Sequence, residues 1–114
     1  MQINKVQNYN PSFGIKISPD IIKAADDLYV KHNNSQEQFN KFYRKAKYME
    51  ENYGFNEYTL EINSRKINGK RAKGIFAVKD DSSKPILIVA KDSITKLLER
   101  FNHISEYELN NKLL

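Results

Sequence analysis

The chain of 114 residues contains no cysteine. Disulfide bonds, thiolate zinc sites and cysteine nucleophiles are therefore excluded. No apolar run approaches the roughly 20 residues that span a bilayer, and the first ten residues, MQINKVQNYN, lack the apolar segment of a secretory signal. We therefore expect no membrane partner and a cytoplasmic location, which also suits a chain without cysteine.

Motifs of common enzyme classes are also missing. The sequence has no H-E-x-x-H pair, no G-x-S-x-G turn, no Walker A loop and no dinucleotide-binding glycine pattern. Its two histidines, His32 and His103, each fall near the end of an expected helix, where histidine commonly interacts with the helix dipole. Adjacent carboxylates such as Asp26 and Asp27 do not face each other on a helix. We expect no enzyme activity, no cofactor and no metal ion.

Excess positive charge is confined to one segment. The chain carries 19 Lys and Arg against 14 Asp and Glu. Residues 64–73, SRKINGKRAK, contain five of those bases and no acid, which leaves 14 bases against 14 acids in the remainder. A local excess of this kind attracts polyanions such as nucleic acids. The candidate nucleic-acid-binding residues are Arg65, Lys66, Lys70, Arg71 and Lys73.

The same segment contains a strong hairpin signal. Asn68-Gly69 is typical of a type I′ turn, because both central residues of that turn need a positive φ. A two-residue turn at this position fixes the register and pairs Arg65 with Ala72. The register distributes the cations over both sides of the ribbon, with Arg65 and Lys70 on one side and Lys66, Arg71 and Lys73 on the other.

The remaining pattern predicts an α+β fold in a single domain, residues 1–114. Apolar and polar residues alternate with period two over about residues 57–90, which predicts an antiparallel three-stranded meander. Residues 13–17 alternate in the same way and predict a short N-terminal strand in the same sheet.

Helix signals flank the expected strands. Ser18 and Ser35 are placed to cap two helices in the N-terminal half, and Asp92 and Ser105 to cap one or two C-terminal helices. Gly54 is placed to end the second helix in a left-handed conformation. We expect these helices to pack against the sheet.

The meander has apolar residues on both faces. A loop at residues 80–83 would pair Ala77 with Ile86 and Ile75 with Ile88. An antiparallel sheet with one solvated face should be more polar than this. We therefore expect the second face to be covered by another part of the chain or to form a protein interface. The residues of that face are Phe76, Val78, Leu87 and Val89.

The segment NPSFGIKI, residues 10–17, resembles an N-terminal signature in small proteins of low-GC bacteria and their mobile elements. The resemblance implies a bacterial or phage lineage and no particular activity. The same residues independently predict a turn followed by a strand.

Two functions fit these features. In the first, a non-enzymatic binding protein contacts an anionic partner, nucleic acid or an acidic protein surface, through the basic hairpin. In the second, the chain is a protein-interaction module: a homodimer through the apolar sheet face, or a phage-type inhibitor of a nucleic-acid enzyme. A third interpretation gives the hairpin no partner, since Lys and Arg also keep an exposed hairpin from pairing edge to edge.

Overall fold

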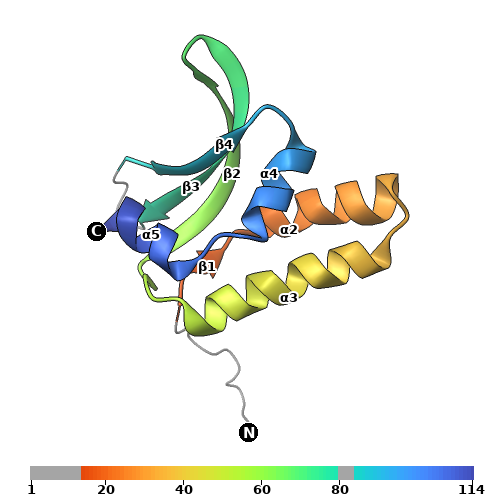
Figure 1. Ribbon diagram of the computed structural model, residues 1–114, viewed down its shortest axis with the longest axis horizontal. Helices are drawn as coiled ribbons and strands as arrows, with labels where there is room; N and C mark the ends of the chain where they lie inside the picture. The colour runs from red at the N-terminus through yellow and green to blue at the C-terminus, as the bar shows by residue number, and fades with distance from the viewer. Residues whose placement is uncertain (1–13, 80–83) are drawn as a thin grey trace, which may run out of the picture.

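A four-stranded sheet and a layer of helices on one of its faces build the molecule (Figure 1). The computed structural model describes residues 14–79 and 84–114. The expected strand residue Phe13 and the expected loop at residues 80–83 lie outside the described residues. The elements are β1 (Lys16–Ile17), α2 (Pro19–Ala25), η1 (Asp26–His32), α3 (Gln36–Asn52), β2 (Tyr58–Ile67), β3 (Lys70–Lys79), β4 (Ile86–Lys91), α4 (Ile94–Phe101) and α5 (Glu106–Leu113).

The α+β class and the meander β2-β3-β4 are confirmed, but the sheet is mixed. The short strand β1 runs parallel to β2, with Lys16 opposite Thr59. The prediction of an antiparallel sheet is therefore wrong at this strand. The helices α2, η1 and α3 lie between β1 and β2, and a connection of that length is the crossover that parallel strands require.

The hairpin prediction is confirmed. Asn68 has a φ of 54° and Gly69 a φ of 80°, as a type I′ turn requires. Arg65 pairs with Ala72, and the antiparallel register continues without interruption from the turn to the base of the two strands. Because β4 pairs with β3 no further than Lys73, the end of the hairpin is a two-stranded ribbon that extends past the rest of the sheet (Figure 1).

The register between β3 and β4 contains a bulge. Ala77 pairs with Ile86 as expected, but Ile75 pairs with Val89 and not with Ile88. The extra residue reverses the alternation of side chains beyond it. Val89 therefore packs against the core, next to the almost fully buried Ile88, and its expected place on the opposite face is wrong.

Serine side chains cap the helices. The hydroxyls of Ser18, Ser35 and Ser105 accept hydrogen bonds from backbone amides in the first turns of α2, α3 and α5. At α4 the expected cap Asp92 is wrong by one residue, because the hydroxyl of Ser93 accepts the bond from the amide of Lys96. The polypeptide between α2 and α3 continues as η1, a π-helical segment of seven residues.

The end of α3 differs from the prediction. The capping residue Tyr53 is extended, and the positive φ, 72°, occurs at Phe55 and not at Gly54. The amide of Gly54 donates instead to the carboxylate of Glu106 on α5, at 2.8 Å. This hydrogen bond joins the segment that follows α3 to the first turn of α5.

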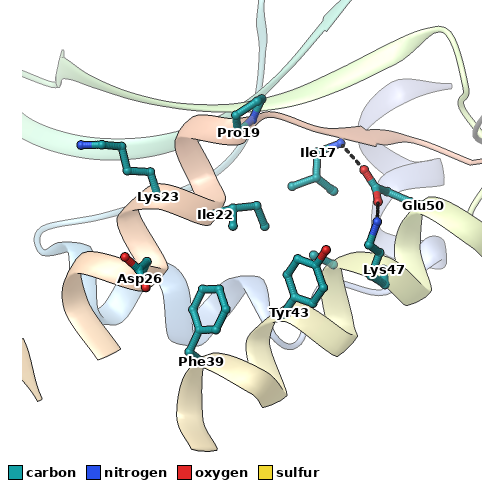
Figure 2. Close-up of a pocket in the computed structure, with 10 residues that line it drawn as sticks. Ile17, Pro19, Ile22, Lys23, Asp26, Phe39, Tyr43, Lys47 and Glu50 are labelled. Carbon is teal, nitrogen blue, oxygen red and sulfur yellow. Dashed lines mark hydrogen bonds and ion pairs between the residues drawn. The ribbon is translucent and has the colours of Figure 1, made fainter. Parts of the chain in front are cut away.

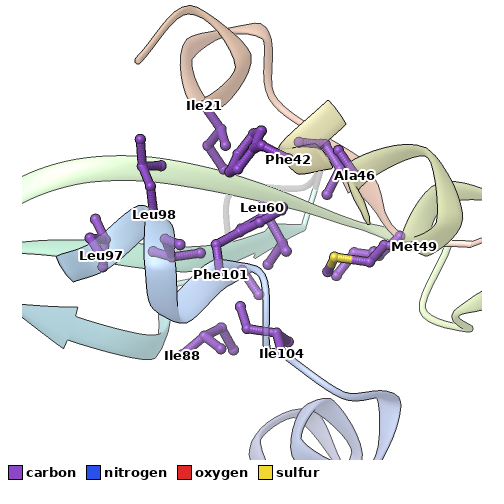
Figure 3. Packing of buried hydrophobic residues seen from close by; sticks show 14 of the residues in the cluster. Ile21, Phe42, Ala46, Met49, Leu60, Ile88, Leu97, Leu98, Phe101 and Ile104 are labelled. Atoms are coloured by element: carbon purple, nitrogen blue, oxygen red, sulfur yellow. The ribbon is translucent and has the colours of Figure 1, made fainter. Parts of the chain in front are cut away.

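The core lies between the helices and one face of the sheet (Figure 3). The rings of Phe42 on α3 and Phe101 on α4 stack at its centre, with centroids 4.8 Å apart. Leu60 on β2 is fully buried beside them. Burial of each such side chain contributes about 1.5–3 kcal/mol, so this contact layer fixes the position of the sheet relative to the helices.

Gly14, the glycine of the N-terminal signature, packs against the C-terminal end of α3. Its amide donates to the carbonyl of Glu50 at 2.9 Å. A Cβ atom at this position would lie 2.0 Å from the carbonyl oxygen of Tyr53 and 2.6 Å from that of Met49. The close approach of the two backbones requires a residue without a side chain.

Candidate functional site

The five hairpin cations are exposed or half-buried and have no carboxylate partner among the residues that the structure describes. Two of them make other contacts. The guanidinium of Arg65 lies 5.2 Å from the ring centroid of Phe76, and the ammonium of Lys73 donates to the hydroxyl of Ser64 at 3.3 Å. The charge of the ribbon is therefore not neutralised by any acid that the structure places beside it.

Three of these cations gather on the side of the ribbon that continues the core face of the sheet. Lys66 is directly opposite Arg71, and Lys73 is directly opposite Ser64 on one side and Lys91 on the other. Directly opposite residues in antiparallel strands share a face. We call the set Lys66, Arg71, Lys73 and Lys91 the inner cluster.

Lys91 belongs to the inner cluster because of the bulge in β4. Without the bulge, Lys91 would be opposite Ala72 and on the other face. Charge clustering in the sequence did not point to Lys91, although the unbroken apolar run at residues 86–89 indicated an irregular strand. Two consecutive core residues in a half-buried strand, here Ile88 and Val89, indicate a break in alternation.

The opposite side of the sheet, here called the outer face, brings together three of the four expected interface residues. Phe76 and Leu87 are directly opposite each other, and Val78 follows on β3. Phe76 is only 5% exposed, because its ring lies beneath Arg65 and across Gly74, where a Cβ would come within 2.7 Å of it. Leu87 is 36% exposed. The outer face is thus a small apolar strip with one buried ring.

A second concentration of cations lies where β4 leads into α4. A hollow of about 340 Å³ is lined by three cations, a histidine and one carboxylate: Lys91, Lys96, Arg100, His103 and Glu99. Arg100 forms an ion pair with Glu108 of α5, and Lys96 lies 3.5 Å from Asp92. Lys91 has no ion-pair partner within residues 14–79 and 84–114.

A larger hollow elsewhere on the surface has a different character (Figure 2). It measures about 560 Å³ and lies between β1, α2 and α3, over apolar side chains that include Phe39 and Tyr43. One oxygen of Glu50 accepts from the amide of Ile17, and the other pairs with Lys47 at 3.6 Å. Glu50, followed by Tyr43, raises the pKa of Lys47. Cations and carboxylates are balanced here, so this cleft does not extend the basic surface.

Within the described residues there is no group of three or more His, Cys, Asp or Glu side chains that could hold a metal ion. Nor does any helix in residues 14–79 and 84–114 have the length and apolar character needed to cross a membrane. Comparisons with protein-family models, curated proteins and solved structures find no match to this chain. Evidence for function therefore comes from the geometry of the ribbon and its surroundings.

Proposed function

We propose that the protein is a non-enzymatic nucleic-acid-binding protein that contacts the phosphate backbone through its β2–β3 ribbon. The observation that carries this proposal is the absence of any carboxylate partner, within the described residues, for five clustered cations. Elsewhere in the molecule, cations such as Lys31, Lys47 and Arg100 have such partners.

The arrangement of the ribbon supports a repeating anion as the partner. Lys66 opposite Arg71, and Lys73 opposite Lys91, place like charges in direct cross-strand pairs, which is unfavourable unless an anion lies between or above them. A nucleic-acid backbone supplies one negative charge at each nucleotide. Four or five such contacts predict a plot of log affinity against log salt with a slope of about −4 on duplex DNA, and little dependence on base sequence.

The alternative, a protein-interaction module, has less support from the geometry. Val89 packs into the core and Phe76 lies beneath Arg65, so Leu87 is the main exposed apolar residue of the outer face. Dimer interfaces usually have a larger apolar centre. A homodimer through this face therefore stays a secondary proposal, which light scattering on the purified protein tests directly.

The main test compares two variants with the same change in charge. The ribbon variant replaces three Lys and one Arg by Gln, at Lys66, Lys70, Arg71 and Lys73. The control variant does the same at exposed positions elsewhere, at Lys41, Arg44, Lys84 and Lys112. Arg65 is retained in both because it covers Phe76.

Fluorescence anisotropy with a labelled duplex and its single strand, over a series of salt concentrations, measures the result. We expect the ribbon variant to lose most of its affinity and about 3 to 4 units of salt slope. The control variant should lose affinity only slightly, through its lower net charge. Equal losses in the two variants, with unchanged melting temperatures, would show that the ribbon is not the binding site.

A further inference from the structure

The cationic surface continues past the ribbon. Lys73 is directly opposite Lys91, and Lys91 also lines the hollow between β4 and α4. The same residue therefore borders both the ribbon and the hollow. Lys96, on the first turns of α4, lines the hollow from the other side. A backbone bound along the inner cluster as far as Lys91 would meet Lys96 next.

The hollow has cations available for an external anion. Lys91 is exposed and has no ion-pair partner among the residues described. The side chains of Lys96 and Asp92 are 63% and 76% exposed, and an ion pair in that setting contributes little and exchanges readily with other anions. Arg100 already forms an ion pair with Glu108. Two lysines thus remain to contact a phosphate.

The other routes away from the ribbon offer a phosphate chain fewer cations for each carboxylate than the hollow between β4 and α4, where Glu99 lies among three cations. On the outer face, Arg65 stacks on Phe76, and Glu61 is directly opposite Phe76 on the same face. Towards η1, Asp27 lines a hollow together with Lys73. A hydrogen bond from Lys31 lowers the pKa of Asp27. The negative charge of this carboxylate disfavours a phosphate beside it.

We infer that a bound nucleic acid continues from the inner cluster into the hollow between β4 and α4, where Lys91 and Lys96 contact its phosphodiester backbone. This inference rests on the proposed function. It adds a direction to the binding path and assigns a contact to Lys91, a residue of β4 outside the hairpin. DNA and RNA share the chemistry that this path recognises, so both are used as probes.

The test compares Lys91, the last residue of β4, with Lys84, which precedes the strand. Lys91→Gln removes the proposed contact, and Lys84→Gln makes the same change in charge just before β4 begins. Binding of labelled single-stranded DNA, single-stranded RNA and duplex DNA is measured for both variants by anisotropy. We expect Lys91→Gln to weaken binding about 3- to 10-fold and to reduce the salt slope by about 0.9 on duplex DNA. Lys84→Gln should match the unmodified protein.

Two further variants sharpen the result. Lys91→Arg keeps the charge and should restore binding. Lys96→Gln should act in the same direction as Lys91→Gln, and more strongly on long probes than on the shortest probes that the ribbon alone can hold. Melting temperatures of all variants establish that they are folded.

The outcomes separate this inference from the proposal on which it rests. If Lys91→Gln binds as tightly as Lys84→Gln while the ribbon variant is defective, the path into the hollow is wrong and the proposed function survives. If the ribbon variant binds as well as its control, the proposed function itself fails. Loss of binding in Lys91→Gln that Lys91→Arg does not restore would also contradict a phosphate contact.

Discussion

The body of the molecule and the ribbon that projects from it differ in whether their clustered charged side chains have ion-pair partners. In the body, Asp27 forms ion pairs with Lys23 and Lys31. Glu50 forms an ion pair with Lys47 and accepts a hydrogen bond from the backbone amide of Ile17. In the ribbon, Lys66 is directly opposite Arg71, and no described carboxylate lies within ion-pair distance of a ribbon cation. These body carboxylates are thus paired within the molecule, whereas the clustered charges of the ribbon remain available to a partner.

This difference in charge pairing determines whether a substitution should change stability or binding. A change in the body removes a contact that the fold itself uses, so it should lower stability. A change at Lys66, Lys70 or Arg71 in the ribbon removes no such contact and should alter binding while leaving the fold intact. Substitutions at the boundary, where Lys91 meets Lys73, should affect both properties in opposite directions.

The largest expected effect on stability is that of Gly14→Ala. The new methyl group would collide with the carbonyl oxygens of Tyr53 and Met49, and backbone atoms in a helix end cannot move aside easily. We expect a loss of about 3 kcal/mol, at the upper end for overpacking. Gly54→Ala is the control, because its nearest new neighbour is a Glu106 side-chain oxygen at 3.5 Å. Urea unfolding of both variants checks the comparison, and similar losses would contradict it.

Tyr53→Phe should have the next largest effect. The hydroxyl of Tyr53 donates to the carbonyl of Ile104 at 2.7 Å and accepts from the ammonium of Lys45 at 2.9 Å. Its removal leaves a buried carbonyl without that donor, at a cost of about 1–2 kcal/mol. Tyr48→Phe removes a hydroxyl from a residue that is 54% exposed and should change the unfolding free energy very little. An equal effect of the two substitutions would mean that the Tyr53 hydrogen bonds do not stabilise the body.

The body should also lose stability at high pH through Tyr29. Burial, followed by the charge of Glu99, raises the pKa of Tyr29 above the ordinary value of 10.0. A group whose folded-state pKa is raised contributes stability below its unfolded pKa and loses it as pH rises through the folded pKa. Tyr29→Phe should therefore reduce the alkaline fall in melting temperature above about pH 10. Tyr107→Phe, at a residue 73% exposed, should leave the fall unchanged.

The smallest expected effect on stability is at the boundary. Lys91→Gln removes a like-charge neighbour of Lys73 and should stabilise the free protein by about 0.2–0.5 kcal/mol at low salt. The gain should disappear as salt is added. Thermal melting at two salt concentrations measures it, with Lys84→Gln as the control. A loss of stability in Lys91→Gln would indicate that this lysine supports the fold.

Local features of this fold could be predicted from the sequence. The Asn68-Gly69 turn specifies its own backbone angles, and a two-residue turn leaves a single register for the strands on either side. The serine caps at Ser18, Ser35 and Ser105 depend on residues two or three positions away. In each case, all the interacting groups lie within a short stretch of the chain.

Features that depend on distant contacts could not be predicted in this way. The direction of β1 depends on the path of three helices, and its two residues carry no signal for it. The amide of Gly54, which has no positive φ, donates a hydrogen bond to Glu106, which lies far along the chain. Of the candidate site, the five hairpin cations were predicted from composition, whereas the place of Lys91 depends on how β4 packs on the core.

The bulge in β4 has a consequence for any comparison of this chain with another sequence. The number of residues between Leu87 and Lys91 determines on which side of the sheet the lysine is displayed. Two proteins with identical charged residues would present different electrostatic surfaces if one of them were a single residue shorter in this strand. An aligned lysine is therefore an equivalent lysine only where the length of the strand has been preserved as well.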